Sequence, residues 1–257
     1  MNSFNKAKPG FGVGEWAPYS YNIGTGCSNG CKYCYARDIA LKFGGISEKG
    51  QWTQERVNQG KADINEKADG MVMFPSMHDI TDNNLTTYMK TLRNILAAGN
   101  QVLIVSKPRM TTVQSICDTF TSFKDSILFR FTIGSQNERV CKFWEPNAPK
   151  PQERINALRH AFEAGYQTSV SAEPMLEGWR EAVALYEALE PIVTDTVWFG
   201  KMQEIDDRVD LSDPVNKSAA NFIRDFQSDA NIRRLYDSLK DRPKVRWKDS
   251  VREVVGI

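Results

Sequence analysis

The stretch GTGCSNGCKYCYAR, residues 24–37, places Cys27, Cys31 and Cys34 in the pattern C-x3-C-x2-C and contains no fourth cysteine. A closed structural zinc site needs four protein ligands, so this spacing leaves one ligand position unfilled. Thiolates so close together suit an iron–sulfur cluster. Three thiolates on a four-iron cluster leave one iron free to bind a substrate or a cofactor.

Zinc is the alternative interpretation of the same cysteines. It requires a distant histidine as the fourth ligand, and the chain has only His78 and His160. Because His160 falls in a predicted surface helix, His78 is the plausible ligand. The chain has five cysteines, an odd number, and three are crowded into eight positions, which favours metal binding in a reduced compartment over a disulfide framework.

The composition is that of a globular protein with a sizeable core. Of 257 residues, 41% are hydrophobic and 25% are charged, and the formal net charge is +1. A charge this small gives no strong overall field to recruit nucleic acid or an anionic membrane. The N-terminal residues lack the apolar region of a signal peptide, and the most apolar run is too short to span a bilayer. The sequence therefore predicts a cytoplasmic protein with no membrane partner.

Short apolar runs of strand length alternate with amphipathic stretches along the chain. The runs are YSYNIG (19–24), MVMFPS (71–76), QVLIVS (101–106), ILFRFTIG (127–134), QTSVSAE (167–173) and DTVWFG (195–200). Six βα units in a row predict a parallel sheet with helices outside, either an open doubly wound sheet or a partial barrel. The cysteines follow the first strand directly, and the loops that leave the carboxyl ends of such strands carry the chemistry.

Two amphipathic stretches predict helices with defined ends. In residues 83–100 the inward face carries Leu85, Tyr88, Met89, Leu92 and Leu96, and Gly99 ends the helix. In residues 151–166 the inward face carries Ile155, Leu158, Ala161 and Phe162, and Gly165 ends the helix. Residues 42–70 are polar and contain glycine, which indicates a helix plus a loop inserted between the first two strands.

The cysteine loop, with Tyr33 directly before the last cysteine, resembles the signature of radical S-adenosylmethionine (SAM) enzymes, whose domain is a partial (β/α)6 barrel. Within that superfamily the chain is most similar to spore photoproduct lyase and to the proteins called DNA repair photolyases. The segments that carry this closer resemblance are GCSNGCKYCYAR (26–37), VSKP (105–108), FRFTIGS (129–135), FWEPNAPKPQERINALRHAFEAGY (143–166) and SAEPMLEGW (171–179).

The resemblance covers roughly residues 20 to 200 and implies a domain organisation. It gives an N-terminal leader (1–18), a radical SAM partial barrel (19–205) and a C-terminal extension that packs on the barrel (206–257). It also implies one 4Fe-4S cluster, one SAM and an electron donor of the flavodoxin or ferredoxin type. In this family SAM chelates the open iron, and its reductive cleavage gives a 5'-deoxyadenosyl radical that abstracts hydrogen from the substrate.

The resemblance also implies roles for individual residues. Cys27, Cys31 and Cys34 hold the cluster, and Tyr33 packs beside it. Lys107, at the end of the third strand, suits the SAM carboxylate, unless it is a solvated loop lysine. The other expected cofactor contacts are Ser76, Ser135 and Glu173, although either serine could instead cap a helix. A buried carboxylate such as Glu173 needs a partner, which favours a place at the barrel mouth for ribose or substrate.

One departure from the family concerns hydrogen return to the product. Spore photoproduct lyases carry a cysteine for this task where the present chain has Ser76, whose O–H bond is too strong. Cys141, in the expected loop after the fourth strand, is the better candidate thiol, although an inert loop thiol is the slightly favoured interpretation. Cys117 is expected to pack a helix. His78 and Asp79 are candidate proton handlers or substrate ligands, and Asp79 is alternatively a cap for the helix near residue 84.

The segment 233–252 is the part of the sequence that bears on the substrate. It carries eight basic residues around Trp247, a pattern that can follow a phosphate backbone and stack a base. A charged helical face followed by a short strand closing the barrel is the simpler explanation, and it is the favoured one. The resemblance implies a radical SAM enzyme of lyase or transferase type, and it favours a nucleic acid or nucleotide as the substrate. The alternatives are a zinc-stabilised nucleic-acid-binding module without catalysis and a cluster-binding partner subunit.

Overall fold

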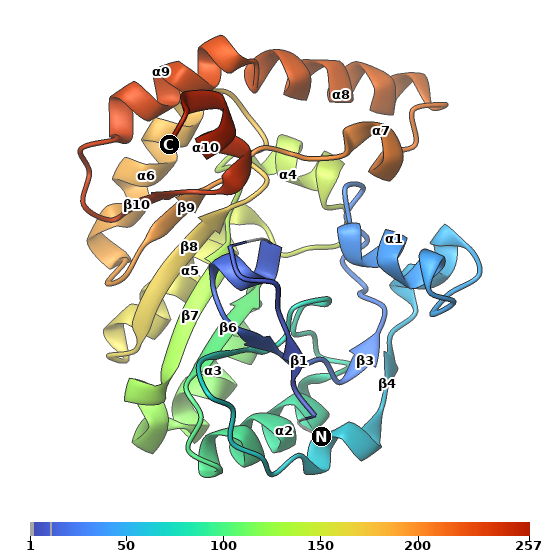
Figure 1. The fold of residues 1–257 in the computed structure, drawn as a ribbon, viewed down its shortest axis with the longest axis vertical. Coiled ribbons are helices and arrows are strands. Elements are labelled where there is room, and N and C mark those ends of the chain that lie inside the picture. The colour runs from blue at the N-terminus through green and yellow to red at the C-terminus, as the bar shows by residue number, and fades with distance from the viewer. Residues whose placement is uncertain (1–2, 11) are drawn as a thin grey trace.

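An eight-stranded sheet forms the centre of the protein (Figure 1). The structure is a computed structural model that describes residues 3–10 and 12–257. The described residues form the strands β1 (Asn5–Lys6), β2 (Tyr19–Ser20), β3 (Gly24–Thr25), β4 (Arg56–Val57), β5 (Val72–Met73), β6 (Val102–Ser106), β7 (Ile127–Thr132), β8 (Gln167–Ala172), β9 (Val197–Phe199) and β10 (Val245–Trp247). Of these, β3 and β4 form a separate two-stranded sheet. The helices are α1 (Tyr35–Lys42), α2 (Leu85–Ala97), α3 (Met110–Thr119), α4 (Glu138–Trp144), α5 (Pro151–Glu163), α6 (Trp179–Leu189), α7 (Ile205–Arg208), α8 (Pro214–Phe226), α9 (Asp229–Leu239) and α10 (Asp249–Val255).

The strand order of the large sheet is β1-β2-β5-β6-β7-β8-β9-β10. Within this sheet, β2 and all the strands after it in the order run parallel to one another. At the edge, β1 pairs with β2 in the antiparallel sense. The two ends of this order do not pair with each other among the described residues, so the barrel is open. The predicted α/β class with a partial barrel is therefore confirmed.

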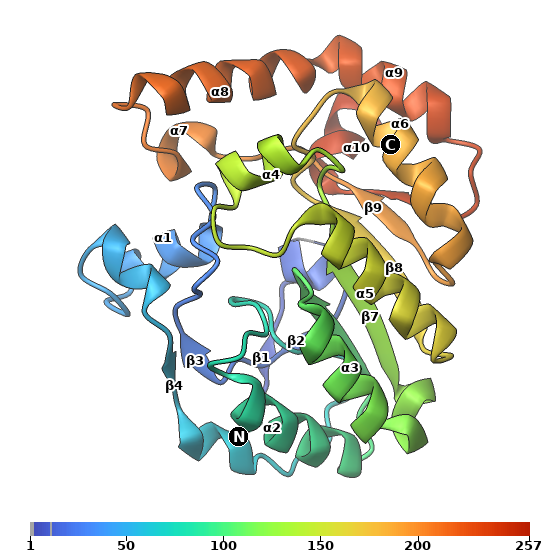
Figure 2. The same cartoon turned by 180° about the vertical axis from the view of Figure 1, so that it is seen from behind.

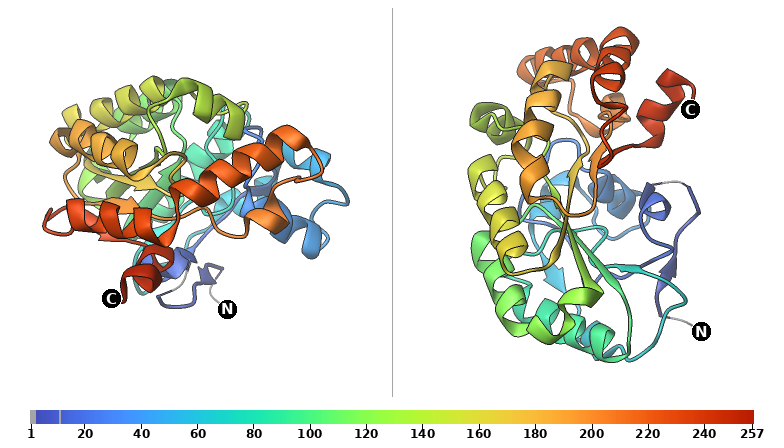
Figure 3. Two further views of the ribbon diagram at one scale, coloured as in Figure 1. Left: turned by 90° about the horizontal axis from the view of Figure 1, so that it is seen from above. Right: turned by 90° about the vertical axis from the view of Figure 1, so that its left-hand side faces the viewer.

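The two faces of the sheet differ because strand side chains alternate. On β7, Phe129 and Phe131 belong to the main core together with helix residues such as Leu158. Arg130 and Thr132, between and after them, face the other way, where Arg130 bonds to Ser169 of β8. Figures 2 and 3 show helices α2, α3, α5 and α6 lying along one side of the sheet, with the N-terminal segment on the other. The inner side of the open barrel is thus partly polar.

Each of the six predicted strands contains a strand of the large sheet, and the two clear helices are also found. Gly99 and Gly165 follow α2 and α5 with φ angles of 82° and 81°, the left-handed conformation that ends a helix. Two expectations are wrong. Phe162 is 36% exposed rather than facing inward. Residues 42–70 hold no α-helix beyond the end of α1, and instead contain the 3-10 turns Lys49–Thr53 and Gln59–Asp63 and the strand β4.

Both ends of the described chain join the barrel. The N-terminal segment supplies β1 and a 3-10 turn, Gly12–Glu15, and the C-terminal segment supplies β10, which pairs with β9. The basic segment 233–252 therefore comprises parts of α9 and α10 with a short strand between them, as the simpler interpretation expected, although this strand extends the sheet rather than closing it. Among the described helices, none has the length and apolar character needed to cross a bilayer.

Candidate active site

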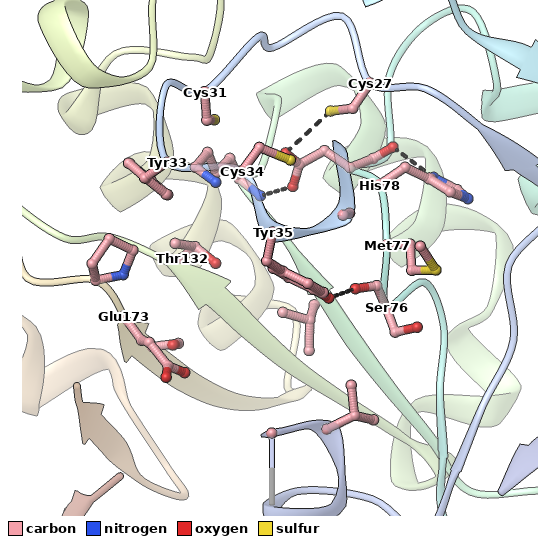
Figure 4. A pocket seen from close by; sticks show the side chains of 18 of the residues that line it. Cys27, Cys31, Tyr33, Cys34, Tyr35, Ser76, Met77, His78, Thr132 and Glu173 are labelled. Atoms are coloured by element: carbon pink, nitrogen blue, oxygen red, sulfur yellow. Dashed lines mark hydrogen bonds between the residues drawn. The ribbon is translucent and has the colours of Figure 1, made fainter. Parts of the chain in front are cut away.

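A cavity of about 310 Å³ opens at the carboxyl ends of the parallel strands (Figure 4). It is lined by most of the residues that the sequence analysis identified, although these come from four separate segments. They are Cys27, Cys31, Tyr33, Cys34, Ser76, His78, Asp79, Lys107 and Glu173. The fold therefore brings the predicted cysteine loop and the predicted strand ends together around one cavity.

The cysteine loop follows β3 and leads directly into α1, whose N-cap is Cys34. Gly26 starts the loop with a φ of 100°, and a Cβ there would lie 2.5 Å from the carbonyl oxygen of Gln54. Only glycine fits such a position. The three thiols sit in buried surroundings, and desolvation raises the pKa of each, that of Cys31 to about 12. Without a metal the loop consequently carries neutral thiols.

The donor set fits an iron–sulfur cluster. Three thiols of one short loop reach the same cavity, and the remaining cysteines, Cys117 and Cys141, do not line it. Within residues 3–10 and 12–257, no three His, Cys, Asp or Glu side chains are close enough together to hold a single metal ion, as a zinc site would require. In a cluster each thiolate binds a different iron, so the sulfurs do not have to converge on one point.

Lys107 extends from the end of β6 into the cavity wall and is only 9% exposed, so it is not a solvated loop lysine. Its Nζ lies 3.9 Å from Oε1 of Glu145 and 5.6 Å from the ring centre of Tyr33. Burial opposes the charge of this lysine, but the neighbouring Cys31 and Tyr33, followed by the carboxylates of Asp79 and Glu145, raise its pKa well above the usual value. Lys107 therefore presents a permanent cation to the cavity.

Glu145 contacts both Lys107 and Tyr33 of the cysteine loop. It is 1% exposed, accepts a hydrogen bond from the Tyr33 hydroxyl and forms an ion pair with Arg154 of α5, which is also 1% exposed. Tyr33 thus packs in the same core cluster as Cys31, and its hydroxyl joins a buried charge network. Because Glu145 and Arg154 are far apart from the cysteines in sequence, no local pattern indicated that they support this loop.

Ser76 follows β5 and lines the cavity, yet its side chain is already engaged. Its Oγ accepts a hydrogen bond of 2.8 Å from Nδ2 of Asn22, whose Oδ1 accepts from the backbone N–H of Ser76 at 2.9 Å. The Tyr35 hydroxyl donates to the carbonyl oxygen of Ser76. Asn22 and Tyr35 are therefore site residues that sequence analysis missed, although Tyr35 directly follows the third cysteine.

Glu173 lies at the end of β8, on the cavity side opposite Ser76. Its Oε2 is 3.4 Å from Nζ of Lys248, which is 2% exposed and pairs with the equally buried Glu15 of the N-terminal segment. A Cβ at Gly200 would lie 2.9 Å from Cγ of Glu173 and 3.0 Å from Cγ of Lys248, so the absence of a side chain there permits their approach. From the sequence alone, Lys248 was only one of the basic residues in segment 233–252.

Glu173 should make the stability of the metal-free protein depend on pH. Burial raises its pKa to about 7 from an ordinary 4.5, despite the opposing effect of Lys248. The folded protein thus retains a proton that the unfolded chain loses, so this group lowers stability as the pH rises from about 4.5 to 7. Glu173→Gln should gain roughly 3 kcal/mol relative to wild type across that window, from 1.36 kcal/mol per pKa unit. Urea unfolding at several pH values tests this, and parallel profiles of the two proteins would contradict it.

Asp79 and His78 follow Ser76 in the same loop. Asp79 is fully occupied by hydrogen bonds and does not cap α2, whose N-cap is Asn84. His78 is 9% exposed, and burial lowers its pKa, so the imidazole is neutral. Its Nδ1 lies 3.1 Å from the carbonyl oxygen of Asp79, which can only accept, so Nδ1 carries the proton. Its buried Nε2 has no hydrogen-bond partner among the described residues.

Two predicted site residues lie outside the cavity lining. Ser135 precedes α4, where its Oγ accepts from the backbone N–H of Asn137 at 2.8 Å and donates to Glu177. Cys141 lies within α4, not in a loop, and is 3% exposed. Its Sγ is 3.6 Å from the carbonyl oxygen of Ser135, and burial raises its pKa to about 12. This thiol therefore packs in the core cluster that also contains Cys31, Tyr33 and Trp144.

Two known proteins resemble this chain in sequence. ORF301 of Acidianus two-tailed virus, described as an uncharacterized protein, is 26% identical over 195 residues, which are 71% of this chain and 64% of the viral protein. The uncharacterized protein MJ0683 of Methanocaldococcus jannaschii is 28% identical over 163 residues, or 62% of this chain and 61% of that protein. The chain therefore spans less than two thirds of the length of these relatives.

Solved structures resemble it in fold. A spore photoproduct lyase variant matches with a TM-score of 0.59 at 19% identity, covering 96% of this chain and 78% of that one. A radical SAM methyltransferase from Sphaerobacter thermophilus matches with a TM-score of 0.52 at 12% identity, covering 91% and 67%. The family model described as spore photoproduct lyase matches residues 3–205. By this match, which includes the cysteine loop and every strand of the barrel but β10, the chain belongs to the spore photoproduct lyase family.

Proposed function

We propose that this protein is a radical SAM enzyme that holds a 4Fe-4S cluster on Cys27, Cys31 and Cys34. The observation that carries the proposal is that these three thiols line one cavity together with Lys107 and Glu173, which follow the parallel strands β6 and β8. Further support comes from a spore photoproduct lyase variant of the same fold that was solved with bound AdoMet. When bound, such a cluster supplies the electron that cleaves SAM to a substrate-activating radical.

The residues of the chain have separate tasks in this proposal. The Lys107 ammonium binds the SAM carboxylate, because a buried cation is a strong partner for a carboxylate. Glu173, on the opposite wall, accepts hydrogen bonds from hydroxyl groups of the ribose or of the substrate. The apolar part of the lining, which includes Met73 and Val105, keeps water from the reacting atoms. Cys141 is not assigned as the hydrogen donor, because its thiol lies in the core cluster behind the cysteine loop.

For the substrate we propose a nucleic acid or nucleotide, with electrons supplied by a protein of the flavodoxin or ferredoxin type. Family membership supports this class, as does a structural neighbour that holds a dinucleoside spore photoproduct. The cavity lining of this chain also includes Lys201 and Arg208, cations that suit a phosphate group although each has a carboxylate neighbour, Asp229 and Glu204 respectively.

The proposal is tested by anaerobic reconstitution with iron and sulfide, followed by dithionite and SAM. We expect brown protein and 5'-deoxyadenosine, detected by chromatography, and substrate screening should begin with ultraviolet-damaged DNA and nucleotides. A colourless protein that binds zinc and forms no nucleoside would instead support the binding module.

Replacing Lys107 should weaken SAM binding without loss of iron. Lys107→Met keeps most of the apolar stem but removes the charge, and a charged hydrogen bond contributes about 1.5–3 kcal/mol. We therefore expect the dissociation constant for SAM, measured by equilibrium dialysis on reconstituted protein, to rise roughly 10- to 100-fold. The exposed Lys142 of α4 offers a control, since Lys142→Met should bind SAM as wild type does. Equal affinities of the Lys107 variant and wild type would remove Lys107 from the site.

A further inference from the structure

Asp79 uses both carboxylate oxygens to join the cysteine loop to the end of β6. Its Oδ2 accepts from Nδ2 of Asn29 at 2.8 Å and lies 3.6 Å from Sγ of Cys27. Its Oδ1 accepts from the backbone N–H of Lys107 at 2.6 Å and from Oγ of Ser106 at 3.0 Å. The Asn29 amide, the Ser106 hydroxyl and the Lys107 backbone N–H all donate to this carboxylate, and such donors favour its ionised form. Asp79 is therefore a fixed anion with no free position for a substrate.

A second carboxylate, Glu55, holds the same loop but does not reach a sulfur among the described contacts. Its Oε1 accepts from the backbone N–H of Ser28 at 2.9 Å, and its Oε2 accepts from Oγ1 of Thr81 at 2.6 Å. Oδ2 of Asp79 lies 3.6 Å from Sγ of Cys27, whereas the described side-chain contacts of Glu55 are with Ser28, Thr81 and Asn84. The two carboxylates thus share a loop-holding role and differ in their electrostatic contact with Cys27.

Metal binding would change the charge state of the contact between Cys27 and Asp79. In the metal-free protein the Cys27 thiol donates toward Oδ2. A thiol that ligates iron has lost its proton, so the same contact then joins two anions. Asn29, Ser106 and the Lys107 backbone keep the carboxylate in place. A fixed negative charge beside a cluster ligand disfavours an added electron, because charge and hydrogen bonding around the sulfurs set the reduction potential.

We propose that Asp79 is a positioning residue with an electrostatic effect: it holds the cysteine loop in register with Lys107 and lowers the reduction potential of the bound cluster. This inference rests on the proposed function, because it assumes a cluster on Cys27, Cys31 and Cys34. It replaces the expectation that Asp79 handles protons or binds substrate. A lower potential makes the reduced cluster a stronger donor of the electron that SAM cleavage requires.

The test is an anaerobic redox titration of reconstituted full-length protein, followed by electron paramagnetic resonance of the reduced cluster. Asp79→Asn removes the charge and keeps the side-chain shape. We expect the ratio of reduced to oxidised cluster at a fixed solution potential to increase at least tenfold, or 59 mV for a one-electron couple. Glu55→Gln removes a charge from the same loop without the sulfur contact, and it should keep the wild-type ratio.

The possible outcomes separate the inference from the proposed function. A wild-type protein that takes up no cluster overturns both. If wild type loads but Asp79→Asn keeps its potential, or if Glu55→Gln shifts it equally, the inference alone is overturned. If Asp79→Asn folds without taking up iron while Glu55→Gln loads, the loop-holding role is supported, and Asp79→Ser, a smaller neutral variant, then measures the effect of the charge.

Discussion

Cys34→Ala is expected to leave a folded protein that neither retains an iron–sulfur cluster nor cleaves SAM. Two remaining thiolates cannot hold a cluster whose fourth iron already lacks a protein ligand. The fold should survive, because Cys34 makes no side-chain hydrogen bond as the N-cap of α1 and is only partly buried. Iron analysis after anaerobic reconstitution should fall from about four irons per chain to background, and 5'-deoxyadenosine should be undetectable.

Cys117→Ala provides the matched control for this loss. Cys117 is 2% exposed in α3 and belongs to the main core, and it does not line the cavity. Removing its sulfur should cost about 1 kcal/mol of unfolding free energy through a small cavity while leaving the iron content unchanged. If the Cys34 variant kept full iron and nucleoside formation, the assignment of the cysteine loop would be wrong.

The barrel was predictable because its strands are short apolar runs separated by helices with clear ends. Gly99 and Gly165 mark those ends, and the runs at 101–106 and 127–134 correspond to β6 and β7. Residues 42–70 were less predictable. Their polar sequence has no strong helical period, and their 3-10 turns are fixed by contacts such as that of Asn94 Nδ2 with the carbonyl oxygen of Ala62.

Several side chains that line the cavity could be predicted from the sequence, but the buried residues that hold them in place could not. Cys27, Lys107 and Glu173 were recognised because each lies at a strand end or in a motif. Glu145 and Lys248 act through buried ion pairs between segments distant in sequence, and such pairs leave no periodic or local pattern. The same limit applies to Asp79, whose proximity to Asn29 arises only from folding. Cys141 was placed in a loop because the seven-residue helix α4 is too short to show a clear period.

The second large effect is expected from Arg154→Met, which should destabilise the metal-free protein by about 3–5 kcal/mol. Arg154 pairs with Glu145, and its Nε and Nη1 donate to the carbonyl oxygens of Pro149 and Thr132 at 2.8 and 3.3 Å. Methionine fills part of the volume but leaves a buried carboxylate and two carbonyl groups without their donor. Lys107, 3.9 Å from Glu145, cannot replace a guanidinium that makes three contacts.

Urea unfolding at neutral pH measures this cost, and an exposed ion pair in the same region gives the comparison. Lys150 and Glu138 are 2.7 Å apart with side chains 70% and 60% exposed, so Lys150→Met should cost less than about 1 kcal/mol. Adding Glu145→Gln to Arg154→Met should recover part of the loss, because the unpaired charge is then gone. If Arg154→Met cost no more than Lys150→Met, the buried pair would not be what holds Tyr33 and the cysteine loop against α5.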